Sequence, residues 1–245
     1  MNNKNNKYLV CNLKANKTKE EMINYEQELC SEYFNNSQIE LIICPSASFL
    51  YLFQSEKYKL GSQDISKYSQ GSYTGEITGE QLSSLNVKYA LIGHSERRKL
   101  FKENNQTIIE KIKNSYHNNI KPIYFIGETE EQRRYGITKN VLEKEISNII
   151  DLIPDYKREK IIIVYEPIWA IGSGMIPTKE EIEGIIITIK DVLNKKYQLN
   201  LPILYGGSVN EENIDILNKI EALDGFVLGE KSKKISELLK IYKNL

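Results

Sequence analysis

Eight short apolar runs recur along this chain, and amphipathic stretches separate them. Several runs are apolar without interruption, which is typical of strands that protein covers on both faces. The third run is the weakest, because Lys59, Gly61 and Ser62 dilute it. The predicted strands are Tyr8–Asn12, Ile39–Cys44, Lys59–Gln63, Tyr89–Gly93, Pro122–Gly127, Ile161–Glu166, Pro202–Gly206 and Gly225–Leu228.

The stretches between the strands have the apolar spacing of helices. Apolar residues recur at helical intervals in the segments 142–153, 182–193 and 238–242. Two helices are predicted to begin after Thr18 and Thr178, because a glutamate three residues after each threonine can complete a capping box.

Eight strand–helix units with short connections admit two architectures, a closed (β/α)8 barrel and a doubly wound open sheet. The number of units and the length of 245 residues favour the barrel. No linker, low-complexity block or charge asymmetry indicates a second domain. The sequence therefore predicts an α/β fold in which residues 1–245 form a single (β/α)8 barrel domain.

One connection is unusually long. It runs from Ile65 to Gly79 and contains the stretch SKYSQGSYTGEIT. Loops of this length without secondary structure are uncommon unless they have a function. We therefore expect this loop to do more than join two elements.

Charge and cysteine content exclude several functional classes. Lys plus Arg and Asp plus Glu are equal at 33 each, so no overall field attracts nucleic acid or an acidic membrane. The polar start, MNNKNNKYLV, lacks the apolar core of a signal peptide, and no apolar run is long enough to cross a bilayer. Cys11, Cys30 and Cys44 have neither a metal-binding spacing nor an even number for disulfides. We expect a cytoplasmic protein with no metal site and no nucleic-acid or membrane partner.

Candidate catalytic residues follow the predicted strands. A barrel places its active residues at the carboxyl ends of its strands. Asn12 and Lys14 follow the first strand. His94 follows the fourth strand and Glu166 the sixth. A carboxylate beneath a closing loop is suited to removing a proton from a carbon next to a carbonyl, while His94 can donate to the carbonyl oxygen and Lys14 can offer positive charge.

The last two strands are followed by candidate phosphate-binding residues. Ser208 follows the seventh strand and Gly229 the eighth, in the two loops where this fold commonly binds phosphate. Both residues are predicted to precede a helix, so that backbone N–H groups and the helix dipole converge on an anion. In the loop after Glu166, Gly172 and Gly174 suit a hinged lid, and the Gly172 N–H could reach the phosphate. The same glycines are weak evidence for a nucleotide site, because a strand–GxGxxG–helix context is absent.

Each of these residue types also has an ordinary structural role. A carboxylate at a strand end is more often a salt-bridge partner than a catalyst, and a lone histidine is more often packed or on the surface. We interpret His117 as a surface residue. We expect Glu96 and Arg97 to form an ion pair that supports the site.

Four segments together resemble the triosephosphate isomerase family. They are Asn12-Leu13-Lys14, GHSERR at 93–98, YEPIWAIGSG at 165–174 and YGGS at 205–208, and they follow the family's order over nearly the whole chain. The resemblance implies a barrel enzyme that works as a homodimer without a cofactor or metal. It implies the interconversion of dihydroxyacetone phosphate and D-glyceraldehyde 3-phosphate through an enediolate, in glycolysis and gluconeogenesis.

The resemblance also implies a role for each matched residue. Glu166 would be the base, His94 the electrophile, and Lys14 a third catalytic residue. The long loop would enter a pocket beside the partner's active site, where Thr74 would support the partner's Lys14. The substrate-binding residues would be Asn12, Lys14, Gly172, Ser208, Gly229 and Glu230, of which the last four hold the phosphate through their backbone.

The chain departs from the family pattern in four places. Leu13 stands where the family has Trp, and Phe125 stands where it has Cys, so we expect altered packing in the core. The second lid hinge is Met175-Ile176-Pro177 in place of Lys-Thr-Ala, and its proline leaves it fewer ways to flex. Glu230 replaces a glycine of the phosphate grip, so its side chain must point to solvent, or Lys231 must compensate its charge.

These departures leave a rival function open, a phosphosugar-binding barrel with weakened or lost catalysis. A different sugar-phosphate isomerase on the same fold is a second rival. GHSERR and YEPIWAIGSG together are far more specific than barrel periodicity, so they favour the triosephosphate isomerase family over this second rival.

Overall fold

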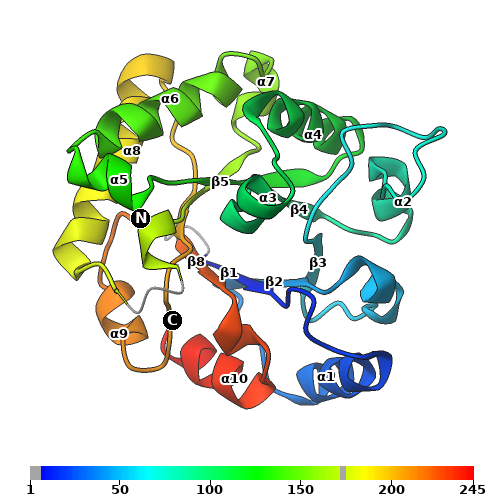
Figure 1. The fold of residues 1–245 in the computed structure, drawn as a ribbon. Coiled ribbons are helices and arrows are strands. Elements are labelled where there is room, and N and C mark those ends of the chain that lie inside the picture. The colour runs from blue at the N-terminus through cyan, green and yellow to red at the C-terminus, as the bar shows by residue number, and fades with distance from the viewer. Residues whose placement is uncertain (1–6, 172–174) are drawn as a thin grey trace.

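The structure, a computed structural model, describes residues 7–171 and 175–245. In these residues eight parallel strands form a closed barrel in which each strand pairs with the next (Figure 1). The first strand also pairs with the last, so that Tyr8 lies opposite Gly225 and Cys11 opposite Leu228. The predicted (β/α)8 barrel is confirmed, and the open sheet is excluded.

All eight predicted strands are present, and no strand end differs from its prediction by more than one residue. Four strands end immediately before a glycine, at Gly93, Gly127, Gly206 and Gly229, where the chain leaves the barrel. The strands are β1 (Lys7–Asn12), β2 (Ile39–Cys44), β3 (Lys59–Ser62), β4 (Tyr89–Ile92), β5 (Lys121–Ile126), β6 (Ile162–Tyr165), β7 (Ile203–Tyr205) and β8 (Gly225–Leu228).

Helices surround the strands and cover the outer face of the barrel (Figure 1). They are α1 (Lys19–Ser31), α2 (Gly79–Ser84), α3 (Ser95–Leu100), α4 (Asn105–His117), α5 (Glu130–Arg134), α6 (Thr138–Ile150), α7 (Asp155–Arg158), α8 (Lys179–Tyr197), α9 (Ile214–Leu217) and α10 (Ile235–Lys243). Three short 3-10 helices also occur, η1 (Ala47–Leu52), η2 (Ile168–Ala170) and η3 (Glu230–Ser232).

The buried apolar side chains form two layers, because alternate residues of a strand point to opposite faces. On β5, Ile123 and Phe125 belong to the cluster that fills the barrel interior. Tyr124 and Ile126 belong to the cluster between the strands and the helices. Phe125 and Val227, both from the interior cluster, also line the pocket at the carboxyl ends of the strands. The interior core therefore supports the floor of that pocket.

Capping boxes begin α1 and α8, as predicted. Thr18 and Thr178 each accept the N–H of the glutamate three residues on, whose carboxylate accepts the N–H of the threonine in return. Two further boxes begin α2 and α5, at Thr78 and Thr129, with glutamine as the third residue. The sequence analysis did not predict these two, although they have the same spacing.

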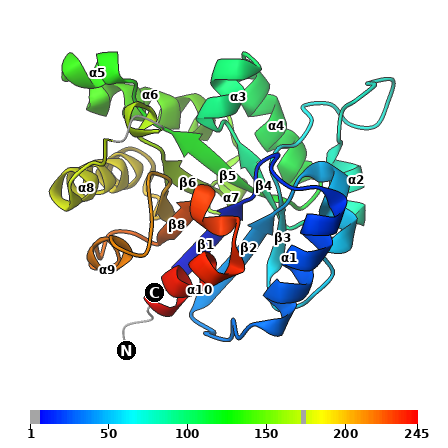
Figure 2. The same ribbon diagram turned by 60° about the horizontal axis from the view of Figure 1, so that its bottom comes forward.

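The long connection between β3 and α2 has no helix or strand and projects from the body of the molecule (Figures 1 and 2). Tyr68 and Tyr73 stack in it with ring centroids 4.0 Å apart. Ser66 Oγ donates to Glu76 Oε2 at 2.5 Å, and Asn114 of α4 donates to the carbonyls of Ser66 and Tyr68 at 2.8 and 2.9 Å. Residues 67–77 are all exposed. The loop is thus an exposed surface whose shape is held by contacts within it and by Asn114 of α4.

Among residues 7–171 and 175–245, no helix has the length and apolar content needed to cross a membrane. Within the described chain, no cluster of three or more His, Cys, Asp or Glu side chains could hold a metal ion. Cys11, Cys30 and Cys44 are free thiols.

Candidate active site

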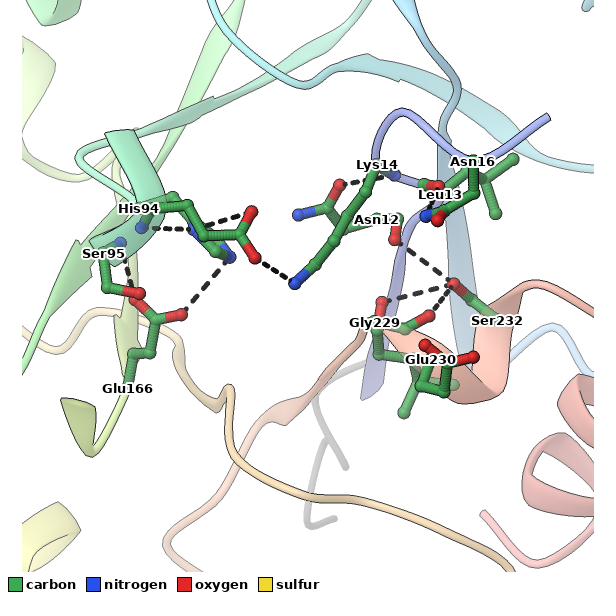
Figure 3. Close-up of polar contacts among 12 residues, drawn as sticks. Asn12, Leu13, Lys14, Asn16, His94, Ser95, Glu166, Gly229, Glu230 and Ser232 are labelled. Atoms are coloured by element: carbon green, nitrogen blue, oxygen red, sulfur yellow. Dashed lines mark hydrogen bonds and ion pairs between the residues drawn. The ribbon is translucent and has the colours of Figure 1, made fainter. Parts of the chain in front are cut away.

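A pocket of about 330 Å³ lies at the carboxyl ends of the strands (Figure 3). Of the predicted site residues, Gly172 lies outside the described residues. The other seven all line this pocket, namely Asn12, Lys14, His94, Glu166, Ser208, Gly229 and Glu230. Side chains from distant parts of the sequence therefore meet at one end of the barrel, as expected from the strand-end rule.

Glu166 follows β6 directly and is almost fully buried, with 3% of its surface exposed. Its Oε2 accepts the backbone N–H of Ser95 at 2.9 Å, and its Oε1 lies 3.3 Å from His94 Nε2 (Figure 3). Burial raises the pKa of the Glu166 carboxyl, and the contacts with His94 and Ser95 only partly offset this rise. The surroundings of Glu166 therefore favour the acceptance of a proton.

A glycine directly after the neighbouring strand, β5, makes room for the backbone of Glu166. A Cβ atom at Gly127 would lie 1.8 Å from the carbonyl oxygen of Glu166, so no side chain fits there. The N–H of Glu166 donates to the carbonyl of Ile126 at 2.8 Å. The two strands are therefore in direct backbone contact where the carboxylate enters the pocket.

His94 is the N-cap of α3 and follows Gly93, whose φ angle is +79°. Its Nδ1 accepts the backbone N–H of Glu96 at 3.2 Å. A ring nitrogen that accepts a hydrogen bond carries no proton, so the geometry assigns a neutral imidazole with its proton on Nε2. His94 therefore presents an N–H donor to the pocket, next to Glu166.

Lys14 has a φ angle of 51°, in the left-handed region that costs free energy for a side chain. Its carbonyl accepts from Ser46 Oγ and Gln63 Nε2, both at 2.9 Å, and its N–H donates to Asn12 Oδ1 at 3.1 Å. Its ammonium pairs with Glu96 Oε1 at 2.5 Å. Burial raises the pKa of Glu96, but the hydrogen bond from Lys14 helps to lower it overall. Lys14 thus reaches the pocket from a fixed backbone and as part of an ion pair.

The expected ion pair between Glu96 and Arg97 is wrong. Arg97 pairs with Asp64 at 2.8 Å and with Glu103 at 2.6 Å, whereas Glu96 pairs with Lys14. Consecutive residues of a helix do not face each other, so the two side chains leave α3 in different directions. Glu96 therefore acts on the pocket through Lys14, and Arg97 ties α3 to the loop after β3.

The two candidate phosphate-binding residues differ in their distance from the next helix. Gly229 directly precedes η3, as predicted. Ser208 does not directly precede a helix, because α9 begins only at Ile214, and this prediction is wrong. A Cβ atom at Gly229 would lie 3.5 Å from Cε of Lys14, so the ammonium side chain passes close to this loop.

Two asparagines explain the delayed start of α9. Asn210 Oδ1 accepts the N–H of Asn213 at 3.0 Å, and Asn213 Nδ2 donates to the carbonyl of Ser208 at 2.8 Å. Such bonds between a side chain and the backbone offer the chain an alternative to a helix. Neither residue was predicted to act here, although asparagines three positions apart are a recognisable turn signal.

Glu230 directs its carboxylate to solvent, as expected for the predicted phosphate site. Its side chain is 80% exposed and its Oε2 pairs with Lys233 Nζ at 2.5 Å. The hydrogen bond from Lys233 lowers the pKa of Glu230. Its φ angle is not positive, so a side chain causes no backbone strain at this position. Lys231, which was expected to compensate the charge if the side chain pointed inward, pairs with Glu211 at 3.1 Å.

Leu13 and Phe125, both expected to change core packing, lie in different places. Leu13 is fully buried between the barrel and the helices, as expected. Phe125 also lines the pocket, and its ring centroid lies 5.0 Å from that of His94 with a tilt of 57° between the rings. The sequence analysis missed this contact. The position of Phe125 two residues after the inward-facing Ile123, close to the end of its strand, was the available signal.

Glu128 anchors the chain that leads into the predicted lid. Its Oε1 accepts from Trp169 Nε1 at 2.8 Å and from the Tyr165 hydroxyl at 3.1 Å. Burial raises the pKa of Glu128. The sequence analysis did not single out Glu128, and no sequence spacing connects it with Trp169. The stiffness expected for the hinge at Met175-Ile176-Pro177 stays a prediction.

The pocket therefore combines four chemical functions. Glu166 provides a buried carboxylate, His94 a neutral N–H donor and Lys14 a cation. On the other side, the loops at Ser208 and Gly229 bring backbone groups to the same cavity. This set can remove a proton from carbon, stabilise an oxyanion and bind a phosphate.

Comparisons with known proteins give one consistent result. The family model described as triosephosphate isomerase matches residues 7–245. A triosephosphate isomerase of Mycoplasmopsis agalactiae is 37% identical over 249 residues, which cover 95% of this chain and 94% of that protein. The triosephosphate isomerase of Alkaliphilus oremlandii is 34% identical and covers 94% of this chain and 96% of its own. That of Mesomycoplasma hyorhinis is 40% identical and covers 76% of this chain and 73% of its own.

Proposed function

This chain belongs to the triosephosphate isomerase family, and we propose on that premise that the pocket is its active site, with Glu166, His94 and Lys14 as catalytic residues. The chain is an isomerase of glycolysis that interconverts dihydroxyacetone phosphate and D-glyceraldehyde 3-phosphate. The convergence of the three side chains on one pocket is the observation that carries the proposal.

Glu166 acts as the base in this proposal. Its carboxylate takes the proton from the hydroxyl-bearing carbon next to the carbonyl of dihydroxyacetone phosphate. The electron pair of that C–H bond becomes the carbon–carbon double bond of an enediolate, and negative charge moves to the carbonyl oxygen. Return of the proton to the neighbouring carbon, with transfer of the hydroxyl proton, gives the aldehyde. The burial of Glu166 supports this role, because water does not compete for the proton.

His94 and Lys14 stabilise the charge that develops on oxygen. When the substrate binds, the Nε2–H of His94 donates a hydrogen bond to the substrate oxygen in place of its contact with Glu166. The ammonium of Lys14 adds a positive charge beside it, and Asn12 fixes the start of that loop through the N–H of Lys14. Donors that are already in place when charge develops are the most effective form of such stabilisation.

The phosphate is held by the loops after β7 and β8 and by the lid. Ser208, Gly229 and Glu230 offer backbone N–H groups, and Gly172, which lies outside the described residues, would add one from the lid. The solvent-directed carboxylate of Glu230 supports this, because a backbone grip needs no side chain there. Moving a proton between adjacent carbons of one molecule involves no net oxidation, so the proposal includes neither a cofactor nor a metal.

The loop around Thr74 makes the enzyme a homodimer in this proposal. It projects from the barrel, is exposed over residues 67–77 and is ordered by its own contacts, which suits a segment that docks against a second copy. Thr74 would then support the partner's Lys14. We also propose that the single barrel domain functions in the cytoplasm, because three free thiols suit a reducing compartment.

A coupled isomerase assay of the purified chain tests the catalytic assignment. Glu166→Gln removes the base and should lower kcat by about 10²–10⁴. His94→Gln removes the imidazole and with it the placed Nε2–H donor, since the amide of glutamine does not reproduce its position, and should lower kcat by about 10²–10³. Both variants should keep the circular dichroism spectrum of the parent.

Two exposed residues supply matched controls. Glu159→Gln and His117→Gln make the same chemical changes at the surface and should leave kcat unchanged. Near-parental turnover in Glu166→Gln or His94→Gln would remove that residue from the mechanism. Saturable ligand binding without turnover in the parent would favour the phosphosugar-binding barrel instead.

A further inference from the structure

Phe125 brings an aromatic ring against the imidazole of His94. It lies on β5, points into the barrel interior and is 1% exposed. Its ring forms part of the pocket wall, with the ring centroids of the two residues 5.0 Å apart and a tilt of 57°. A rigid apolar surface therefore packs beside the proposed electrophile.

The polar contacts of His94 hold the edge of its ring, whereas packing must hold its faces. Nδ1 is held by the backbone N–H of Glu96 at 3.2 Å, and Nε2 faces Glu166 Oε1 at 3.3 Å. Hydrogen bonds to ring nitrogens lie close to the ring plane, so these two contacts fix positions within that plane. Rotation of the ring about the Cβ–Cγ bond is opposed only by the angular preference of these two contacts, and this χ2 torsion is itself broad. A neighbour packed against the face of the ring limits the rotation sterically.

The backbone positions of Phe125 and His94 are fixed relative to each other. Arg98 Nε donates to the carbonyl of Gly93 at 2.9 Å, directly before His94. Arg98 Nη2 donates to the carbonyl of Phe125 at 3.2 Å. One guanidinium therefore connects the strand end that carries the imidazole with the residue that packs against it, so the phenyl ring is a fixed wall.

We propose that Phe125 is a positioning residue for His94, whose ring holds the imidazole at the tilt that directs Nε2–H to the substrate oxygen. The inference rests on the proposed role of His94 as the electrophile. A hydrogen bond weakens steeply as its angle departs from linear, so a tilted imidazole would stabilise the oxyanion poorly. The phenyl ring also fills space that water would otherwise occupy beside the donor.

Phe125→Leu tests the proposal, because it keeps an apolar side chain and removes the flat ring. Loss of alignment should lower kcat by about 10-fold or more. The KM should stay within about twofold of the parent value, because the proposed phosphate grip is made by backbone groups of other loops. Competitive inhibition by inorganic phosphate should likewise be unchanged, and it measures the phosphate grip separately.

Phe226→Leu is the matched control. Phe226 is also a strand phenylalanine, on β8, and it is 0% exposed, but it belongs to the layer between the barrel and the helices rather than to the wall of the pocket. The two substitutions remove the same atoms from equally buried positions. The Tm of both variants should fall by similar amounts, while only Phe125→Leu should lose kcat.

A double-mutant cycle separates positioning of His94 from a general effect on the pocket. If Phe125 acts through His94, the loss caused by Phe125→Leu should shrink to about twofold or less in a His94→Gln background. An equal loss in both backgrounds would overturn the proposal. So would parental kcat in Phe125→Leu, or a rise in KM with kcat unchanged.

Two provisions keep the outcome decisive. Should Phe125→Leu not fold, Phe125→Met, whose unbranched flexible side chain adapts to the space but has no flat ring, replaces it with the same expected loss of kcat. Parental turnover in His94→Gln would refute the proposed function itself. A large loss in His94→Gln together with control-like behaviour of Phe125→Leu would refute only the role of Phe125.

Discussion

Burial of the Glu166 carboxyl sets the pH range in which the proposed base can act. The group must be ionised to accept a proton, and burial raises its pKa above the ordinary value of 4.5. As the pH falls through this raised pKa, the base becomes protonated and activity is lost. The acid limb of kcat/KM should therefore lie above pH 4.5.

The pH dependence of kcat/KM reports the ionisation of the free enzyme and free substrate. The substrate phosphate also ionises, near a pH of about 6, and its own titration must be measured and subtracted. A corrected limb at or below the ordinary glutamate value would contradict a buried base. Glu159→Gln is the control, and the acid limb of its kcat/KM profile should match that of the parent.

Glu230 tests whether the phosphate grip tolerates an acidic side chain. Glu230→Gly removes a negative charge near a bound dianion, so KM should fall or stay unchanged. The fall should not exceed about fivefold, because the carboxylate is 80% exposed and paired with Lys233, where solvent and salt screen its charge. Steady-state KM at low and moderate ionic strength measures this.

Glu230→Gln removes the charge without adding the backbone freedom of glycine, and it separates the two effects. A large rise in KM for either variant would mean that the Glu230 side chain itself supports the substrate. This outcome would move Glu230 from the backbone grip to a side-chain contact.

At the level of the elements, sequence patterns predicted the strands well and the connections less well. Several of the strands are continuous apolar runs, the pattern that burial on both faces of a barrel strand favours. The predicted helix start after Ser208 was wrong, because Asn210 and Asn213 bond to the backbone and delay α9 to Ile214. Side-chain partners such as those of Arg97 depend on how three segments pack, which spacing along one helix does not specify.

The candidate site, like the fold, was predicted only in part. The strand-end rule placed Lys14, His94 and Glu166 in one pocket, because parallel strands of a barrel all end on the same side. The contact between Phe125 and His94 was not predicted, since it depends on how neighbouring strands are staggered. The contact between Glu128 and Trp169 was not predicted for a similar reason, because it joins the loops after two different strands.

The N-cap of α8 offers a prediction about one element. Thr178 caps this helix directly after the predicted lid hinge, and its hydroxyl accepts the N–H of Glu181 at 3.2 Å. Thr178→Ala should lower the free energy of unfolding by about 1 kcal/mol. Denaturant unfolding measures the change.

Thr188→Ala is the control, because Thr188 lies in the middle of the same helix and its hydroxyl bonds to the carbonyl of Gly184 within that helix. Its effect should be smaller than that of Thr178→Ala. Equal losses from both variants would show that the cap contributes nothing beyond a surface threonine.

For the whole molecule, the proposed dimer gives a prediction about assembly and activity together. Thr74→Arg places a long charged side chain on the exposed loop and should weaken association of two copies. Sedimentation should then show monomer at concentrations where the parent is dimeric. Activity per chain should fall as the fraction of dimer falls, because the loop is proposed to support the partner's Lys14.

Thr188→Arg makes the same change on α8, away from the loop, and should leave both assembly and turnover unaltered. A parental sedimentation profile for Thr74→Arg would place the interface elsewhere. Full activity in a purely monomeric Thr74→Arg variant would remove the loop from the proposed support of Lys14.

The pairing of β1 with β8 has a consequence for how the chain matures on the ribosome. Lys14 follows β1 and Gly229 follows β8, so the first of these strands is synthesised early and the second late. A nascent chain that lacks β8 leaves β1 and β7 as open edges, which invite pairing with other chains. Chaperone binding during translation should therefore persist until this last strand emerges. The emergence of β8 would then complete the proposed substrate pocket and pair the open edges of β1 and β7.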